Sequence, residues 1–162
     1  MPTPTSLSGW IDTPLLSIAA EQREAHVRYC SLFADDVLSR FPQWIEGLDQ
    51  HRPPDTAALH EEIAQSGLNA GLRRYRNRLM LSIVWRDLCG LATLKETFSD
   101  LTALAEICLQ AAIDEHGRRL QEKYGKPLGA DGTEQGIFVI GMGKFGGGEL
   151  NLSSDIDVMF CY

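Results

Sequence analysis

Apolar residues recur at helical spacing over most of the first 124 residues of the chain. Thr13 and Pro14 are typical of a helix start, and the apolar pattern after them continues to Leu38, so a first helix is predicted there. Pro42 ends or kinks this helix, a short second helix follows the proline, and Asp55 is positioned to cap a third. This half of the pattern predicts an all-α bundle.

Two longer helices are predicted further along. Segment 72–88 carries apolar residues at steps of three and four, which is the spacing of one buried helix face. Thr93 and Glu96 form a capping-box pattern, so a long helix begins there and ends at Gly125. Four arginines of segment 72–88 lie away from the apolar stripe and predict a solvated face with salt bridges, with contact to a phosphate or an acidic partner as the alternative. They are Arg73, Arg74, Arg76 and Arg78.

The glycine content of the chain rises sharply near residue 125. Nine of its 15 glycines lie between Gly125 and Gly148, a density that long helices do not tolerate. We therefore expect an all-α region over residues 1–125, a linker over 126–136, and the start of a second, β-containing domain over 137–162.

The last 26 residues carry the candidate chemistry. Ile137 to Ile140 predicts a buried strand, and Asp155 to Phe160 predicts a second strand with strict alternation. Asp155 and Asp157 then share one face of that strand. Two neighbouring carboxylates repel each other unless a cation lies between them, and oxygen ligands favour Mg²⁺, which can bridge phosphate oxygens.

Two other motifs compete for the glycines between these strands. A Walker A loop is excluded, because Gly143-Lys144 is followed by Phe145 and Phe138 stands where the first glycine is required. The segment from Gly141 to Gly146 matches the GxGxxG turn of dinucleotide-binding folds. The short, polar stretch after it is a poor crossover helix, so this interpretation is the weaker alternative.

A glycine-rich turn followed by Asp-hydrophobic-Asp on a strand resembles the nucleotidyltransferase superfamily of polymerase-β type. The longer string GMGKFGGGELNLSSDIDVMF, residues 141–160, is similar to the signature of glutamine synthetase adenylyltransferase/adenylyl-removase, a bifunctional family that attaches and removes AMP on a tyrosine of glutamine synthetase. Helical segments 76–90 and 101–106 also resemble the region upstream of the first catalytic domain in that family. The resemblance implies a mostly α chain, in which a helical bundle leads into the first β-turn-β unit of a polymerase-β-like α+β fold.

The wording of the motif is more similar to the N-terminal, deadenylylating domain of that family than to the other one. The resemblance implies that inorganic phosphate cleaves adenylyl-tyrosine and releases ADP, whereas a partner domain uses ATP to add AMP. It implies catalysis and Mg²⁺ binding by Asp155 and Asp157, and hydrogen bonds to phosphate or turn capping by Ser153 and Ser154. The residues implied to approach the nucleotide phosphates are Gly141, Gly143, Lys144, Gly146 and Gly147. Glutamine synthetase and a PII-type signalling protein are the implied partners.

Two departures from the superfamily pattern bear on activity. Gly143-Lys144 stands where the superfamily usually has Gly-Ser, and no third carboxylate follows the aspartate pair within the 162 residues. The expectation is a truncated domain that is inactive alone. A non-catalytic helical interaction module and a nucleotidyltransferase with another acceptor are the alternatives.

Composition narrows the setting. A net charge of −7 gives no general attraction to nucleic acid, and no apolar run approaches the roughly 20 residues of a membrane span. The N-terminus has no secretory pattern, so a cytoplasmic location is expected. The four cysteines are predicted to be mostly buried thiols, and His60-Glu61 lacks the second histidine of a zinc motif, so no zinc site is expected.

Overall fold

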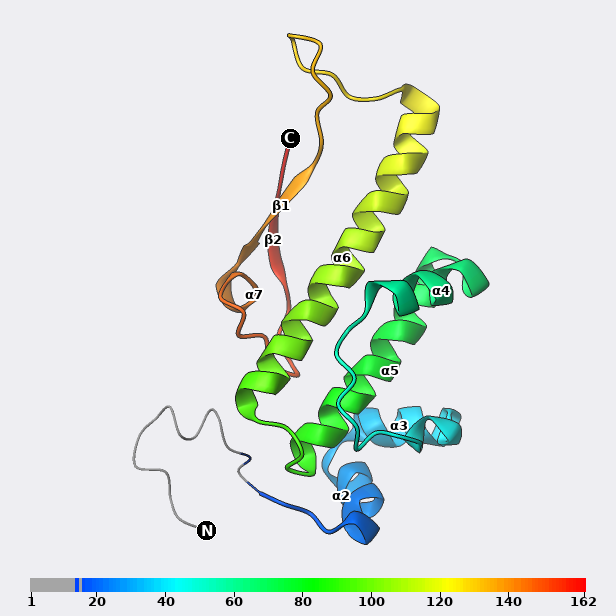
Figure 1. Ribbon diagram of the computed structural model, residues 1–162, viewed down its shortest axis with the longest axis vertical. Coiled ribbons are helices and arrows are strands. Elements are labelled where there is room, and N and C mark those ends of the chain that lie inside the picture. Colours follow the sequence, from blue (N-terminus) through cyan, green and yellow to red (C-terminus); the bar gives the residue numbers. More distant parts are fainter. Residues whose placement is uncertain (1–13, 15) are drawn as a thin grey trace.

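The structure is a computed structural model that describes residues 14 and 16–162. Helices make up most of residues 20–124, and a two-stranded hairpin follows them beside the longest helix (Figure 1). The predicted mostly α architecture with a β-turn-β unit is confirmed. In chain order the elements are η1 (Ala20–Gln22), α2 (Arg23–Cys30), α3 (Leu32–Arg40), η2 (Pro42–Ile45), α4 (Thr56–Ser66), α5 (Leu68–Leu88), α6 (Leu94–Tyr124), β1 (Phe138–Met142), α7 (Gly143–Gly146) and β2 (Asp157–Cys161).

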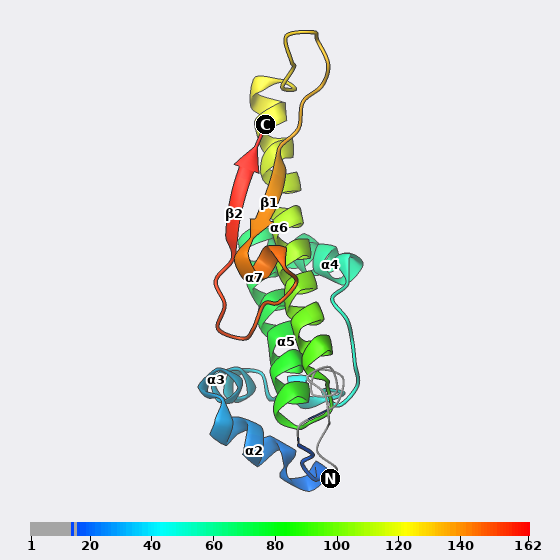
Figure 2. The same cartoon turned by 90° about the vertical axis from the view of Figure 1, so that its left-hand side faces the viewer.

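Helix α5 is the centre of the helical region, since α2, α3, α4 and α6 all contact it. Helices α2 and α3 pack at one end of the molecule, and the hairpin stands against the face of α6 that points away from α4 (Figures 1 and 2). Segment 126–136, predicted as a linker, contains a small turn closed by an isolated bridge between Leu128 and Glu134. The part of the chain that the structure describes contains no helix long and apolar enough to cross a membrane.

The single N-terminal helix predicted to run to Leu38 is wrong. The chain has two helices there, α2 and α3, separated at Ser31, whose backbone is extended. The Ser31 hydroxyl accepts a hydrogen bond from the Ala34 amide at 3.2 Å, so serine caps a new helix at the break. Redirecting the chain in this way lets Val37 and Leu38 enter the core, where both are fully buried. The predicted start at Thr13 lies outside the described residues.

Three other helix ends follow the predicted caps, whereas α5 begins at Leu68, before the predicted segment 72–88. Asp55 accepts hydrogen bonds from the first amides of α4, and Gly125 ends α6 with a positive φ of 84°. The Thr93 hydroxyl caps Glu96 N, but the Glu96 carboxylate turns to Arg86 instead of back to the Thr93 amide. Only half of the capping box therefore forms.

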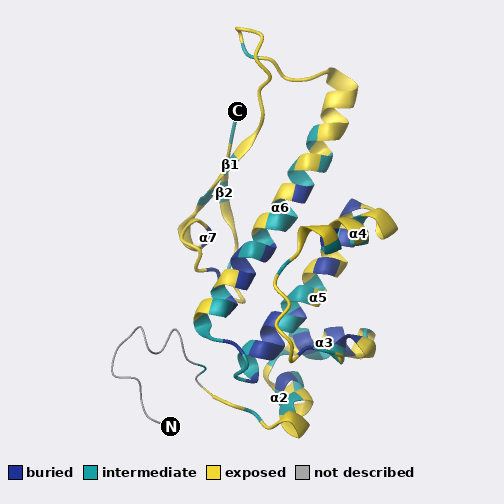
Figure 3. Ribbon diagram, in the orientation of Figure 1, coloured by how far each residue is buried: buried dark blue, intermediate teal, exposed yellow. Residues whose placement is uncertain are grey.

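Two apolar clusters form the core (Figure 3). The first joins α2, α3 and the segment after Pro42 to the C-terminal half of α5, with Leu38 and Leu81 fully buried. The second joins α4, α5 and α6 to the hairpin. Its buried residues are Leu59, Tyr75, Ile83, Leu101, Leu104, Ala111, Phe145 and Leu150. The hairpin thus shares a core with the helical region.

Two of the sequence's side-chain predictions can now be compared with the structure. The four arginines from Arg73 to Arg78 are exposed, and Arg74 pairs with Glu62 of α4 at 3.3 Å, as expected for a solvated face. The described cysteines are all free thiols, but only Cys89 is buried and Cys30 is exposed. Burial raises the pKa of the Cys89 and Cys108 thiols to about 11, which keeps them protonated and unreactive at neutral pH.

Gly71 and Gly117, both inside helices, are expected to respond oppositely to alanine. A Cβ at Gly117 in α6 meets no atom within 4 Å, whereas a Cβ at Gly71 in α5 lies 2.7 Å from Ile63 Cα of α4. We expect Gly117→Ala to stabilise the fold by about 1 kcal/mol through helix propensity. Gly71→Ala is expected to cost about 1–3 kcal/mol because it pushes the two helices apart. Urea unfolding followed by circular dichroism measures both, and stabilisation by Gly71→Ala would contradict the close packing of α4 on α5.

Candidate functional site

The hairpin brings the two halves of the predicted motif together. Strands β1 and β2 pair antiparallel, with Met142 opposite Asp157. Gly143 therefore follows β1 directly beside the start of β2, and a Cβ built on it would lie 3.6 Å from Asp157 Oδ2. Gly143 has a positive φ of 55°, a conformation that glycine adopts without strain and that turns the chain into α7.

The antiparallel pairing excludes the dinucleotide-binding alternative. A βαβ unit needs parallel strands joined by a crossover helix. Here α7 has only four residues and β2 returns beside β1 in the opposite direction. The GxGxxG spacing is thus present without the fold that gives it that function.

Both strands differ from their predictions in extent and burial. The second strand begins at Asp157, so Asp155 lies in the loop that leads into it. The prediction of a buried first strand is wrong, because Ile137, Phe138 and Ile140 are 54%, 58% and 46% exposed. The reason is that the hairpin meets the helices through one face, where Val158 packs against the second core cluster.

The turn between the strands is tightly built. We call residues 143–150 the glycine-rich loop; its first turn is α7, and three backbone hydrogen bonds close it. The Gly147 amide donates to Gly143 O at 3.0 Å, the Gly148 amide to Phe145 O at 3.1 Å, and the Glu149 amide to Lys144 O at 2.8 Å. A Cβ at Gly146 would lie 2.3 Å from Gly141 O, so only glycine fits where α7 crosses β1.

The polar segment after this loop forms a turn of its own. Asn151 Oδ1 accepts from the Ser154 hydroxyl at 2.7 Å and from the Ser153 amide at 3.3 Å. The Ser154 hydroxyl also accepts from the Asn151 amide. Turn capping therefore accounts for Ser154, whereas the Ser153 hydroxyl makes no hydrogen bond with any residue that the structure describes.

Asp155 and Asp157 are exposed, as is Lys144. Within residues 16–162, neither aspartate pairs with a Lys, Arg or His side chain. The described chain places only one set of three possible metal-ligating groups together, and it lies in the helical region: His51, Glu96 and Asp100. At the hairpin, the possible metal ligands are therefore two solvent-exposed carboxylates, those of Asp155 and Asp157.

The sequence did not predict the cluster formed by His51, Glu96 and Asp100. His51 Nε2 lies 3.0 Å from Asp100 Oδ2, and Arg86 donates to Glu96 Oε1 from Nε at 3.0 Å and from Nη2 at 2.7 Å. Burial raises the pKa of Asp100. Arg86 already supplies a positive charge beside these carboxylates. Its contacts and those of His51 tie the loop before α4 to α5 and α6.

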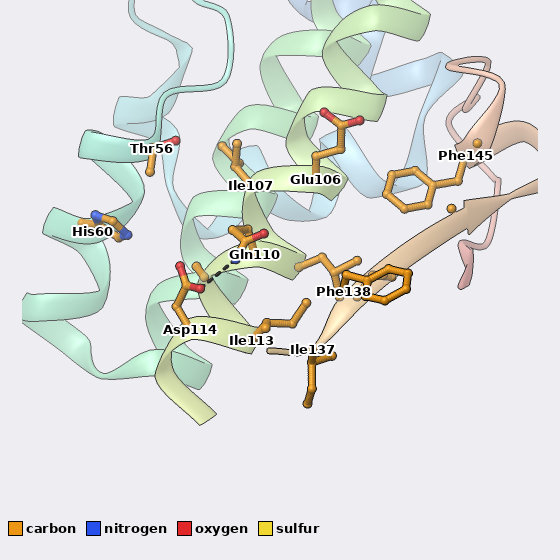
Figure 4. Close-up of a pocket in the computed structure, with 15 residues that line it drawn as sticks. Thr56, His60, Glu106, Ile107, Gln110, Ile113, Asp114, Ile137, Phe138 and Phe145 are labelled. Atoms are coloured by element: carbon orange, nitrogen blue, oxygen red, sulfur yellow. Dashed lines mark hydrogen bonds between the residues drawn. The ribbon is translucent and has the colours of Figure 1, made fainter. Parts of the chain in front are cut away.

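A cavity of about 700 Å³ lies between the hairpin, α4 and α6 (Figure 4). Thr56 and His60 of α4 line one side, and Phe138 and Phe145 line the hairpin side. Gln110 and Asp114 of α6 line the wall between them and share a hydrogen bond of 2.7 Å. Sequence spacing could not reveal this cavity, because its walls come from α4, α6, β1 and α7.

Comparison with known proteins agrees with the resemblance seen in the motif. The sequence profile of the family described as "Glutamate-ammonia ligase adenylyltransferase" matches residues 22–162. The chain therefore belongs to this family.

Relatives carry the name bifunctional glutamine synthetase adenylyltransferase/adenylyl-removing enzyme. One from Xanthomonas axonopodis pv. citri is 40% identical over 143 residues, which cover 88% of this chain and 15% of the relative. One from Shewanella loihica is 39% identical over 140 residues, covering 80% and 15%. One from Thioalkalivibrio sulfidiphilus is 50% identical over 108 residues, covering 66% and 11%. The chain thus spans about 15% of the length of the first two relatives.

Proposed function

We propose that this chain contributes the opening part of the deadenylylating domain of a glutamine synthetase adenylyltransferase/adenylyl-removing enzyme. The observation that carries the proposal is the antiparallel hairpin, which sets Gly143 beside Asp157 at the junction of β1 and α7. In this function inorganic phosphate attacks the adenylyl phosphorus, the bond to the tyrosine oxygen breaks, and ADP and free tyrosine are released. Family membership supports the adenylyltransferase class, and the wording of the motif supports the deadenylylating domain.

Asp155 and Asp157 are the proposed ligands of Mg²⁺. Their carboxylates are the hard oxygen donors that this ion prefers, they are exposed, and they are free of cationic side chains within the described residues. When bound, Mg²⁺ would neutralise charge on the phosphate oxygens during transfer. The chain's own part is to hold both carboxylates at the start of β2, next to the glycine-rich loop.

Phosphate contacts are proposed for the glycine-rich loop and its neighbours. Gly141 and Gly146 let α7 pack directly on β1, Gly147 lies close to the Gly143 carbonyl, and Gly143 turns the chain beside Asp157. The proposed phosphate contacts of these four glycines are made through the backbone. Lys144 is exposed at the same turn and supplies a positive charge. The Ser153 hydroxyl, which has no hydrogen-bond partner among the described residues, is the better of the two serine candidates for a phosphate hydrogen bond.

The proposed partners are glutamine synthetase, named in the description of the relatives, and a PII-type signalling protein. ATP, ADP and phosphate are the proposed small-molecule ligands, and the cytoplasm is the proposed location. We propose that the 162-residue chain alone is inactive, because its motif supplies the Asp155 and Asp157 carboxylates where the superfamily uses three.

Nucleotide protection tests this function. With ADP and Mg²⁺, amide hydrogen exchange between Gly141 and Asp157 should slow, and EDTA should reverse the effect. In Asp155→Asn, the ADP concentration needed for the same protection should rise about tenfold or more, since the substitution removes one of two proposed metal ligands. Asp131→Asn, which changes another exposed aspartate, is the matched control and should leave protection unchanged.

Two results would contradict the proposal. Protection that is equal with and without Mg²⁺ would exclude the metal role of the aspartates. Release of ADP from adenylylated glutamine synthetase by the purified chain, with phosphate and Mg²⁺ and lost in Asp155→Asn, would overturn the inactivity of the chain alone.

A further inference from the structure

The glycine-rich loop is held at two apolar points and is otherwise exposed. Phe145 and Leu150 are only 8% and 4% exposed, whereas Lys144 and the residues from Gly146 to Glu149 are exposed to solvent. Both buried side chains belong to the core cluster that contains Leu101 and Leu104 of α6. Figure 4 shows the Phe145 ring pointing from the hairpin toward α6.

The packing around Phe145 leaves α7 little freedom to shift against β1. A Cβ at Gly141 would lie 2.9 Å from the Phe145 ring, and a Cβ at Gly146 would lie 2.3 Å from Gly141 O. The ring, α7 and the end of β1 are therefore in direct contact without side chains between them. Gly143 is the first residue of α7 and directly follows β1. The packing of the Phe145 side chain against α6 therefore also sets the position of Gly143 beside Asp157.

We propose that Phe145 and Leu150 are positioning residues of the nucleotide site and that α6 is the platform on which they hold the glycine-rich loop. This inference rests on the proposed function for its ligand, ADP with Mg²⁺. The same cluster includes Leu59 of α4 and Tyr75 of α5, so α4 and α5 support α6 in this role. The helical region is then part of the nucleotide site's architecture, and loosening α6 changes the loop without any contact to the ligand.

The ligand-free part of the test measures hydrogen exchange of the three loop amides that are bonded within the loop, those of Gly147, Gly148 and Glu149. In Phe145→Ala they should exchange about tenfold faster or more, because the loop opens locally while α6 stays protected. Phe145→Leu should restore most of the protection. The matched control, Leu38→Ala, alters a fully buried leucine of the first core cluster and should leave the three amides as protected, relative to α6, as in the unaltered chain.

Leu104→Ala is the decisive variant for the platform. Leu104 lies on α6 and is 3% exposed, and it belongs to no part of the loop. It should reproduce the faster exchange of the loop amides seen in Phe145→Ala. Loop amides that stay fully protected in both variants would overturn the proposal that the cluster holds the loop.

The ligand-bound part separates this inference from the proposed function. The dissociation constant for ADP with Mg²⁺ should rise about tenfold or more in Phe145→Ala and Leu104→Ala, and recover in Phe145→Leu. An unaltered chain that binds no ADP would refute the proposed function, while the exchange data would still decide whether α6 positions the loop. Variants with faster exchange but unchanged ADP affinity would overturn the positioning role.

Discussion

Replacing Arg86 by methionine is expected to destabilise the fold by about 3–5 kcal/mol, a large part of the total stability of a domain this size. Arg86 is only 8% exposed. Its guanidinium donates to Glu96 of α6, to the Leu91 carbonyl and to the Asp49 carbonyl. Methionine fills much of the same volume, so the main loss is the charge and its hydrogen bonds, which leaves Glu96 and two carbonyls without their partner.

Urea unfolding followed by circular dichroism measures this effect. Arg73→Met is the matched control, because Arg73 lies on the same helix and is exposed; its stability should stay within about 0.5 kcal/mol of the unaltered chain. An Arg86→Met protein as stable as the Arg73→Met protein would show that the buried ion pair contributes no net stability.

Replacing Gly146 by alanine is expected to displace α7 from β1 and disorder the glycine-rich loop. The added Cβ would lie 2.3 Å from the Gly141 carbonyl oxygen, and neither atom belongs to a flexible side chain that could move away. Overpacking of this kind costs about 1–3 kcal/mol. The loss should be concentrated in the hairpin, because α2 and α3 belong to the other core cluster.

Amide hydrogen exchange resolves where the loss falls. In Gly146→Ala the Gly148 and Glu149 amides should lose protection before those of α5. Gly136→Ala is the control and should behave like the unaltered chain, because a Cβ added at Gly136 would meet no atom within 4 Å and its φ is not positive. Retained protection of the loop in Gly146→Ala would mean that β1 and α7 are not packed as closely as described.

Local signals predicted most of the helical region. Two helices begin at side chains that accept hydrogen bonds from amides two or three residues away, those of Asp55 and Thr93, and α6 ends at Gly125. Because these contacts are local, the sequence predicts them. The N-terminal helix was predicted wrongly because its apolar period continues through Ser31, where the serine cap and the packing of α3 on α5 together favour a break. Helix periodicity does not record where a chain must turn to reach its core.

The candidate site shows the same division. Gly141, Gly143, Asp155 and Asp157 were predicted because they lie within one short motif whose wording resembles a known family. The role of Phe145 was not predicted, because a phenylalanine among glycines says nothing of the helix against which it packs. The cavity behind the hairpin and the Arg86 contacts also join distant segments, so no local pattern signals them.

The sequence by itself determined the family, the helix caps and the residues of the glycine-rich motif, since each depends on neighbours a few positions apart. The tertiary structure decided which way the strands pair, which face of the hairpin is covered, and which buried side chains hold the motif. Those features depend on contacts between α4, α5, α6 and the hairpin, and the free energy of such contacts arises only when distant segments exclude water together.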